Sequence, residues 1–275
     1  MVEKKKENGS EPSGSHNGVD AKEDAPPHTA RICGVNNTVI CALAVIAVSV
    51  LFEANNGPPQ CPMCEAAFRA DLGTLQELIG TRGAANTEAD RFGNRPLHWA
   101  CKNVVMRYRN PHPYLQAASL KTIKMLVTRS NAEMKAANNA GTPALHWACT
   151  KSPRSVIEYL LENGADITQK NQAGETALHW AVHWINEEAV AAILKHDEAK
   201  IHEVISMQDE NGNTALHNIS PGCATDPACQ RIVANFMKHN ADLTTKNNFG
   251  RTPLAHFDYA AATETLKSDA KKSTS

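Results

Sequence analysis

The chain has 275 residues, enough for one or two globular domains, and its 28 basic and 29 acidic residues leave a formal net charge of −1. This balance removes the electrostatic field that would draw the whole protein onto nucleic acid, so no nucleic-acid partner is expected. Aromatic residues make up only 5% of the chain, and Ala and Leu are frequent, which favours an all-α fold over a β-rich one.

The first 31 residues are polar and contain almost no large apolar side chain. Glycine, serine, proline and a run of lysines dominate this segment. It cannot bury enough apolar surface to offset its chain entropy. Residues 1–31 are therefore predicted to form a disordered tail.

An apolar run follows the polar tail. Thr38–Phe52 holds fifteen residues without a charge, and extending the run back to Ile32 gives 21. Because about 20 helical residues span a bilayer core, we expect residues 32–52 to form one transmembrane helix, a signal anchor with the lipid bilayer as its partner. The alternative is a cleaved signal peptide, whose apolar region has a similar length. No clear small-residue cleavage site follows in "EANNGPPQC", and residues 53–63 are interpreted as a linker.

Charges on either side of this segment bear on its orientation. Five basic residues precede it, whereas the first basic residue after it is Arg69. The positive-inside rule favours a cytosolic N-terminus, with the rest of the chain across the membrane. Three of the five, Lys4, Lys5 and Lys6, lie far from the segment, so the sequence leaves the orientation of this single-pass membrane protein open.

A short phrase recurs in the remaining chain: Asn or Asp, two spacer residues and Gly. It occurs at Asp90–Gly93, Asn138–Gly141, Asn171–Gly174, Asp209–Gly212 and Asn247–Gly250. A Leu follows four residues after each Gly, and in four phrases the next residue is a histidine: His98, His146, His179 and His217. Asn or Asp with Gly is typical of a tight turn, and Thr176, Thr214 and Thr252 are placed to cap a following helix. Apolar residues at helical spacing then indicate a second helix in each unit.

These units resemble the ankyrin repeat, whose signature is T-P-L-H-x-A and whose period is about 33 residues. "GETALHWAV" at 174–182 and "GRTPLAHF" at 250–257 carry the resemblance most closely. It covers residues 64–267 and implies an all-α ankyrin-repeat solenoid of about five helix-turn-helix units with β-turn tips, plus caps. Residues 268–275 are expected to form a second disordered tail. The resemblance also implies that the repeated histidines are structural and tie adjacent turns together.

The period of the repeat drifts. Successive turn glycines are 48, 33, 38 and 38 residues apart. Three of these intervals exceed the 33-residue period, which indicates three insertions. They lie around Val105–Ala118, His196–Ser206 and Ser220–Cys229. Insertions in a solenoid map to loops, often on a functional face, so these three segments are expected to be loops.

The repeated histidines could suggest a metal site, but their spacing opposes one. Helices packed side by side lie about 10 Å apart, whereas zinc ligands sit within about 2.1 Å of the metal. Equivalent histidines therefore cannot share one ion. His179 and His183 have the i, i+4 spacing of a helical metal pair, but no third ligand is evident. No metal and no cofactor are predicted.

Two cysteine pairs leave alternatives open. Cys61 and Cys64 have the spacing of a redox or zinc motif, but neither two further ligands nor a βαβ context is evident. They are interpreted as incidental thiols or as an acylation site near the membrane. Cys223 and Cys229 enclose a short loop and could form a disulfide in an oxidising compartment, or remain free thiols in the cytosol.

We find no phosphate-binding loop and no nucleophile elbow, so the chain is not expected to be an enzyme. The predicted function is protein–protein recognition by a membrane-anchored scaffold or adaptor, with a partner protein that the sequence does not identify. The alternative is a secreted or exported ankyrin effector whose apolar segment is cleaved, and a metal- or thiol-dependent activity is a distant third.

The resemblance implies binding through the turn tips and the adjacent concave helical face. Exposed aromatic residues are frequent interaction hot spots, so Phe92 and Phe249 are the predicted anchors. The predicted binding residues at the tips are Arg91, Phe92, Asn94, Asn139, Gln172, Glu175, Glu210, Asn213, Asn248, Phe249 and Arg251.

Overall fold

The computed structural model describes residues 61–82, 88–107, 113–130, 134–220, 223 and 226–255. The predicted transmembrane helix, both predicted tails and the part of the predicted repeat array beyond residue 255 lie outside these ranges. No helix within them is long and apolar enough to cross a membrane. The linker was predicted to reach residue 63, but the first described helix already begins at Pro62.

The described residues form α-helices and one short 3₁₀ helix, with no β-strand among them, which confirms the predicted all-helical fold for this part of the chain. In chain order the elements are α2 (Pro62–Arg69), α3 (Leu72–Arg82), α4 (Pro96–Arg107), α5 (Pro113–Ser130), α6 (Ala144–Lys151), α7 (Arg154–Glu162), α8 (Ala177–His183), α9 (Glu187–His196), α10 (Glu198–Ser206), η1 (Ala215–Asn218) and α11 (Pro227–Lys238).

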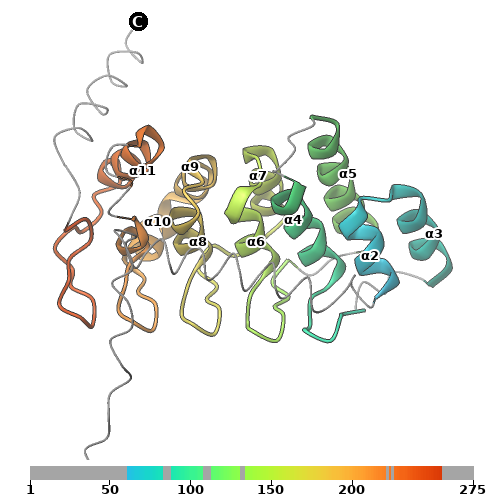
Figure 1. The fold of residues 1–275 in the computed structure, drawn as a ribbon, viewed down its shortest axis with the longest axis horizontal. Helices are drawn as coiled ribbons and strands as arrows, with labels where there is room; N and C mark the ends of the chain where they lie inside the picture. The colour runs from blue at the N-terminus through green and yellow to red at the C-terminus, as the bar shows by residue number, and fades with distance from the viewer. Residues whose placement is uncertain are drawn as a thin grey trace, which may run out of the picture. The chain divides into compact units, whose positions relative to one another are not determined.

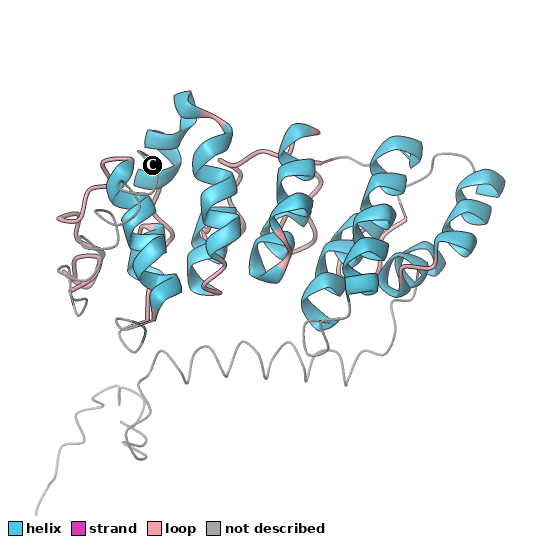
Figure 2. Cartoon of the chain, turned by 90° about the horizontal axis from the view of Figure 1, so that it is seen from above, coloured by secondary structure: helices cyan, strands magenta, loops and turns pink. Residues whose placement is uncertain are grey.

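The helices stack as repeated pairs in two layers. The first helices α4, α6 and α8 and then η1 contact one another in sequence, and the second helices α5, α7, α9 and α11 do the same. The pair α2–α3 packs on the first repeat, at α4 and α5, as the expected N-terminal cap. Figure 1 shows the turn tips projecting from one side of this row, and Figure 2 shows the helices side by side with nearly parallel axes.

Each turn tip is built by its first residue and its glycine. In the first tip, Asp90 Oδ1 accepts the backbone N–H groups of Phe92 and Asn94, at 2.8 and 2.9 Å. The same pair of bonds is made by Asn138, Asn171, Asp209 and Asn247 in their own tips. The tip glycines have φ near +70°, a conformation that disfavours a side chain. The tip therefore requires a side-chain oxygen at its first residue and a positive φ at its last, which explains why Asn or Asp and Gly recur at these positions.

Successive tips are joined by backbone hydrogen bonds. Asn139 N donates to Phe92 O at 2.9 Å, Gln172 N to Ala140 O at 3.1 Å and Glu210 N to Ala173 O at 3.0 Å. A fourth bond, from Asn248 N to Asn211 O, continues the series. Gly174 lies against the next tip, because a Cβ there would approach Glu210 N to 2.8 Å. The tips therefore form one ladder whose members hold each other in register.

The prediction that His196–Ser206 forms a loop is wrong. This segment forms α10, because Asp197 caps its N-terminus by accepting the N–H of Ala199 at 3.1 Å. Ile201, Val204 and Ile205 lie on one helical face and are buried, so the inserted residues extend the core. The first insertion is also partly helical, since α4 continues to Arg107 and α5 starts at Pro113.

The fourth repeat begins with a short 3₁₀ helix where an α-helix was expected. η1 ends at Asn218, shortly before Pro221. Proline has no backbone N–H to donate, and it disfavours helical geometry at the residue before it. The first helix of this unit therefore stops after four residues, and the chain continues into the segment that contains Cys223.

Candidate functional site

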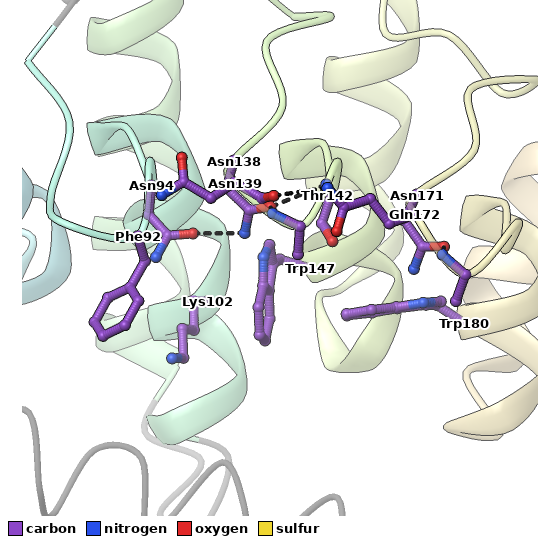
Figure 3. A pocket seen from close by; sticks show the side chains of 12 residues that line it. Phe92, Asn94, Lys102, Asn138, Asn139, Thr142, Trp147, Asn171, Gln172 and Trp180 are labelled. Carbon is purple, nitrogen blue, oxygen red and sulfur yellow. Dashed lines mark hydrogen bonds between the residues drawn. The ribbon is translucent and has the colours of Figure 1, made fainter.

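A groove of about 600 Å³ lies between the turn tips and the first helices of three consecutive repeats. Its lining residues are Phe92, Asn94, Lys102, Asn138, Asn139, Ala140, Thr142, Trp147, Asn171, Gln172, Ala173 and Trp180. Figure 3 shows the side chains of Lys102, Trp147 and Trp180 on the helices directly beside the tip residues. The groove is thus formed by two structural layers, a row of tip residues and a row of helix residues.

Tryptophans occupy one position in three repeats, and two of them, Trp147 and Trp180, line the groove. Trp99, Trp147 and Trp180 each directly follow the histidine of their unit. The rings of Trp147 and Trp180 meet edge to face, with centroids 5.2 Å apart and an interplanar angle of 80°. The T-shaped arrangement is a favourable geometry for aromatic pairs, and it fixes both rings along the groove.

The indole N–H groups of this row differ in their partners. Trp99 Nε1 donates to Asp90 Oδ2 at 2.9 Å, and Trp180 Nε1 donates to Glu175 Oε2 at 2.8 Å. Trp147 Nε1 is buried and has no hydrogen-bond partner within the described part of the chain. Only the middle tryptophan of the row therefore lacks the carboxylate that its neighbours bind.

A lysine lies between two of these rings. The ammonium of Lys102 is 4.7 Å from the centroid of Trp99 and 5.0 Å from that of Trp147, and the residue is only 6% exposed. Its charge is attracted by both aromatic faces. Among the described residues that line the groove, Lys102 is the one with an ionisable side chain.

The structure places the predicted tip residues in two kinds of position. Four of them, Phe92, Asn94, Asn139 and Gln172, line the groove. The amides of Asn139, Gln172 and Asn248 donate to a backbone carbonyl of the preceding tip, and the Oδ1 atoms of Asn94 and Asn213 accept from the asparagine of the next tip. Several predicted binding side chains therefore also hold the ladder together.

The remaining predicted residues lie around or beyond the groove. The guanidinium of Arg91 lies 4.7 Å from the ring centroid of Phe92, at the N-terminal end. Glu175 accepts hydrogen bonds from the side chains of Asn171 and Trp180. Three more are exposed on the last tips: Glu210, Phe249 and Arg251. Phe249 is 69% exposed, so the two predicted aromatic anchors occupy different places, one in the groove and one outside it.

Sequence reasoning missed three of the helix residues that line this groove. Trp147, Trp180 and Lys102 were not selected, although the thrice-repeated "LHWA" motif places a tryptophan at one position of three repeats. The motif was interpreted only through its histidine. A large aromatic at the same position of three repeats was the available signal, and using it required the orientation of the first helices to be known.

The repeated histidines each join two repeats. Their Nε2 atoms bond to carbonyl oxygens of the next tip at 3.0–3.1 Å: His98 to Thr142, His146 to Glu175, His179 to Asn213 and His217 to Arg251. In three units, Nδ1 accepts the N–H of the residue three positions earlier, namely Arg95, Thr176 or Thr214. A ring that accepts at Nδ1 carries its proton at Nε2, so these histidines are neutral.

Burial supports the same protonation state. It lowers the pKa of His98 and of His146 to about 4 and also lowers that of His179. Since both ring nitrogens of His179 are already hydrogen-bonded, it has no lone pair left to pair with His183 on a metal. The described residues contain no group of three or more side chains that could hold a metal ion.

His146 departs from the pattern. The residue three positions before it is Pro143, which has no N–H, and Nδ1 of His146 is buried without a hydrogen-bond partner among the described residues. In the other units this position is Arg95, Thr176 or Thr214. The second repeat thus carries two unpaired buried nitrogens, one on His146 and one on Trp147.

The described cysteines fall into three environments. Cys61 caps α2, where its sulfur accepts the N–H of Cys64 at 3.1 Å. A hydrogen bond between the two thiols lowers the pKa of Cys61 and raises that of Cys64, and both residues are buried. Burial raises the pKa of the Cys101 thiol to about 12, and burial together with the nearby Cys101 raises that of Cys149, so neither is a reactive thiolate. Cys223 and Cys229 form a disulfide.

Comparison with known proteins supports the ankyrin assignment. A family model described as ankyrin repeats in three copies matches residues 114–205 and 156–220. No curated protein sequence matches the chain. The crystal structure of the ankyrin-repeat protein EF0377 shares the fold, with a TM-score of 0.58 and 24% identity over 75% of this chain and 94% of that one.

A second solved structure is similar over a comparable share of the chain. It is a chain in the complex of the predatory endopeptidase Bd0816 from Bdellovibrio bacteriovorus with the immunity protein Bd3460. That chain has a TM-score of 0.54 and 25% identity, covering 78% of this chain and all of that one. Together with the family model, these likenesses identify the fold as an all-helical ankyrin-repeat array.

Proposed function

We propose that this ankyrin-repeat chain recognises another protein through the groove along its tips, and that it does so as a scaffold or adaptor held at a membrane. Ankyrin repeats are generally protein-interaction modules, not enzymes. The observation that carries the proposal is the groove itself, which has a volume of about 600 Å³ and is lined by Phe92, Trp147 and Trp180. It lies along tips that are joined to one another by backbone hydrogen bonds.

The composition of the groove fits protein recognition. Tryptophan, tyrosine and arginine are enriched among interface hot spots, and most of them lie near the centre of an interface. Here Trp147 and Trp180 line the groove together with amide side chains such as those of Asn139 and Gln172. Because the tips are fixed by their backbone bonds, little ordering entropy is lost when a partner binds.

The comparison with the Bdellovibrio complex points the same way. That structure contains a predatory endopeptidase bound to an immunity protein. A similar solenoid in a protein–protein complex supports a binding role for this chain, although it identifies no partner for it.

The membrane part of the proposal rests on residues 32–52. Their apolar run has the length of a short transmembrane helix, and no clear cleavage site follows it. The disulfide between Cys223 and Cys229 supports repeats that face an oxidising compartment. The basic residues before the run favour the same orientation, with the N-terminus in the cytosol.

Affinity capture with the full chain in detergent tests the binding role. We expect Phe92→Ala to reduce recovery of the partner, because its ring lines the groove. Tyr159→Ala is the matched control, since Tyr159 lies on α7, outside the residues that line the groove, where it stacks with Lys124. Equal recovery with wild type and Phe92→Ala would remove Phe92 as an anchor, and capture of no protein at all by the wild type would oppose the function itself.

Two fractionation experiments test the anchor. We expect the full chain to stay in the pellet after alkaline extraction of membranes, and a chain lacking residues 38–52 to be released. Protease added to sealed membranes should spare the repeats until detergent is present. A mature N-terminus near Gln60, measured by mass spectrometry, would instead support the alternative of a cleaved signal peptide and a secreted effector.

A further inference from the structure

We propose that Cys61 and Cys64 are a reversible dithiol–disulfide pair, in which Cys61 attacks a low-molecular-weight disulfide such as oxidised glutathione and Cys64 then closes an intramolecular bond. This site is separate from the groove, and the inference does not depend on the proposed function. It is carried by the way in which the start of α2 places the two sulfurs and by the contrast with the other described cysteines.

The start of α2 brings the two thiols together. Cys61 is the N-cap residue and Cys64 is the third residue of the helix, which are the two positions whose side chains meet in a capping box. Cys61 Sγ accepts the backbone N–H of Cys64 at 3.1 Å, and the two thiols also share a hydrogen bond. Pro62 occupies the first helical position, where its fixed φ suits the helix. A disulfide can therefore close between neighbouring side chains at this helix start.

The surroundings give the two thiols different roles. The hydrogen bond from Cys64 lowers the pKa of Cys61, against the opposing effects of burial and of the Glu88 carboxylate. The same hydrogen bond, together with burial, raises the pKa of Cys64. Cys61 is 5% exposed, whereas Cys64, Cys101 and Cys149 are each 0% exposed. Cys61 is therefore the attacking thiol, and Cys64 needs no exposure because it reacts inside the protein.

The exchange takes place in two steps. Glu88 Oε2, 3.6 Å from Cys61 Sγ, accepts the Cys61 proton, and the thiolate attacks one sulfur of the small disulfide. A mixed disulfide forms and one small thiolate leaves. This thiolate takes the proton of Cys64, whose sulfur attacks Cys61 Sγ, so that the protein disulfide closes and the second small thiolate leaves with the proton held by Glu88. Two electrons and two protons thus pass to the small disulfide, which becomes two thiols.

Hydrogen bonds from both thiols favour the reduced form. Cys61 Sγ–H donates to Glu88 Oε2 and Cys64 Sγ–H donates to Asn94 O, each at 3.6 Å. A disulfide has no S–H group and loses both bonds. Because stabilising the dithiol makes a disulfide easier to reduce, the pair is expected to open and close with the redox state of its surroundings. In the same structure it is present as two thiols, while Cys223 and Cys229 form a disulfide.

Titration of the full chain in detergent with oxidised glutathione, in the presence of reduced glutathione, tests the inference. The exchange is stopped with acid, the remaining thiols are alkylated in denaturant, and peptide mass spectrometry reports each cysteine separately. We expect Cys61 and Cys64 to change from two alkylated thiols to one disulfide, and to return when reduced glutathione is added. Cys101 and Cys149 should stay alkylated throughout. This arm uses the wild type and needs no variant that folds.

Single serine variants separate the two roles. In Cys64→Ser the mixed disulfide cannot be resolved, so Cys61 should retain one glutathione. In Cys61→Ser, where serine can still cap α2, Cys64 should remain a free thiol because it is fully buried. Cys101→Ser is the matched control, since Cys101 is also a buried free thiol. Its Cys61–Cys64 pair should close as in the wild type.

Three results would overturn the inference. The first is a wild type whose Cys61 and Cys64 stay alkylated at every glutathione ratio, as Cys101 does. The second is a glutathione adduct on Cys64 in Cys61→Ser, with none on Cys61 in Cys64→Ser. The third is an acyl group on either cysteine of the purified chain. Each of them leaves recognition through the groove in place, because partner capture with Phe92→Ala tests that function separately.

Discussion

Replacing Pro143 with threonine should stabilise the protein. Pro143 stands where Thr176 and Thr214 stand in the next two repeats, and its backbone angles of −74° and 163° are close to theirs. Threonine therefore fits the site without strain. Its N–H would donate to the buried Nδ1 of His146, which now has no hydrogen-bond partner among the described residues.

The magnitude follows from three terms. Pairing a buried acceptor that is now unsatisfied contributes about 1–3 kcal/mol, and a threonine N-cap contributes about 1 kcal/mol where Pro143 makes no side-chain cap bond. Loss of the proline restraint on the unfolded chain costs about 0.4–1 kcal/mol. The first two terms exceed the third, so we expect a gain of about 1–3 kcal/mol in the free energy of unfolding.

Urea unfolding of the full chain at pH 7, followed by tryptophan fluorescence, measures this gain. Pro153→Thr is the matched control, because Pro153 also precedes a helix without a side-chain cap bond but has no histidine three residues later. It should change stability little. The reasoning is refuted if Pro143→Thr is no more stable than Pro153→Thr, since the unpaired nitrogen of His146 would then cost nothing.

Three further predictions concern stability. Because burial lowers the folded pKa of His98 and His146 from 6.5 to about 4, the unfolded chain binds protons first. The free energy of unfolding in urea should therefore fall as the pH drops from about 6.5 to about 4, by roughly 3 kcal/mol per histidine, and a free energy that does not change with pH would contradict the assignment. Gly174→Ala should cost at least about 1 kcal/mol more than Gly250→Ala in the same urea assay, since both have φ near +75° but a Cβ crowds the next tip only at Gly174; equal losses would oppose tip-to-tip packing. Dithiothreitol should lower the stability of the wild type by about 2 kcal/mol and leave Cys229→Ser unchanged, whereas equal sensitivity of both would argue against the disulfide.

The repeat could be predicted from sequence because its signals are local. Each tip depends on an Asn or Asp and a Gly within four residues, whose side-chain and backbone requirements are met inside the tip itself. The helical insertion at α10 was missed for a different reason. Spacing showed that residues had been added at His196–Ser206 but not their conformation, although Asp197 and the apolar Ile201, Val204 and Ile205 carried a helical pattern.

The groove could be predicted only in part. Tips are visible in the sequence, but two of the predicted tip residues, Asn139 and Gln172, also bind the preceding tip, and that contact joins residues 33 or more positions apart. The position of Lys102 between two indole rings depends on how α4 and α6 pack, which no local pattern specifies. Comparing the repeats at the tryptophan position, and not only at the histidine position, would have indicated that Trp147 and Trp180 belong to one surface.

Site-specific photo-crosslinking tests the central claim most directly. A benzoylphenylalanine at position 140, where the tip residue Ala140 lines the groove, should form a covalent bond to the partner on irradiation. The same probe in place of the exposed Glu162, at the end of α7 in the second-helix layer, should not. Crosslinking from position 140 and not from position 162 is the expected result. Partner capture with crosslinking from position 162 and none from position 140 would contradict recognition through the groove.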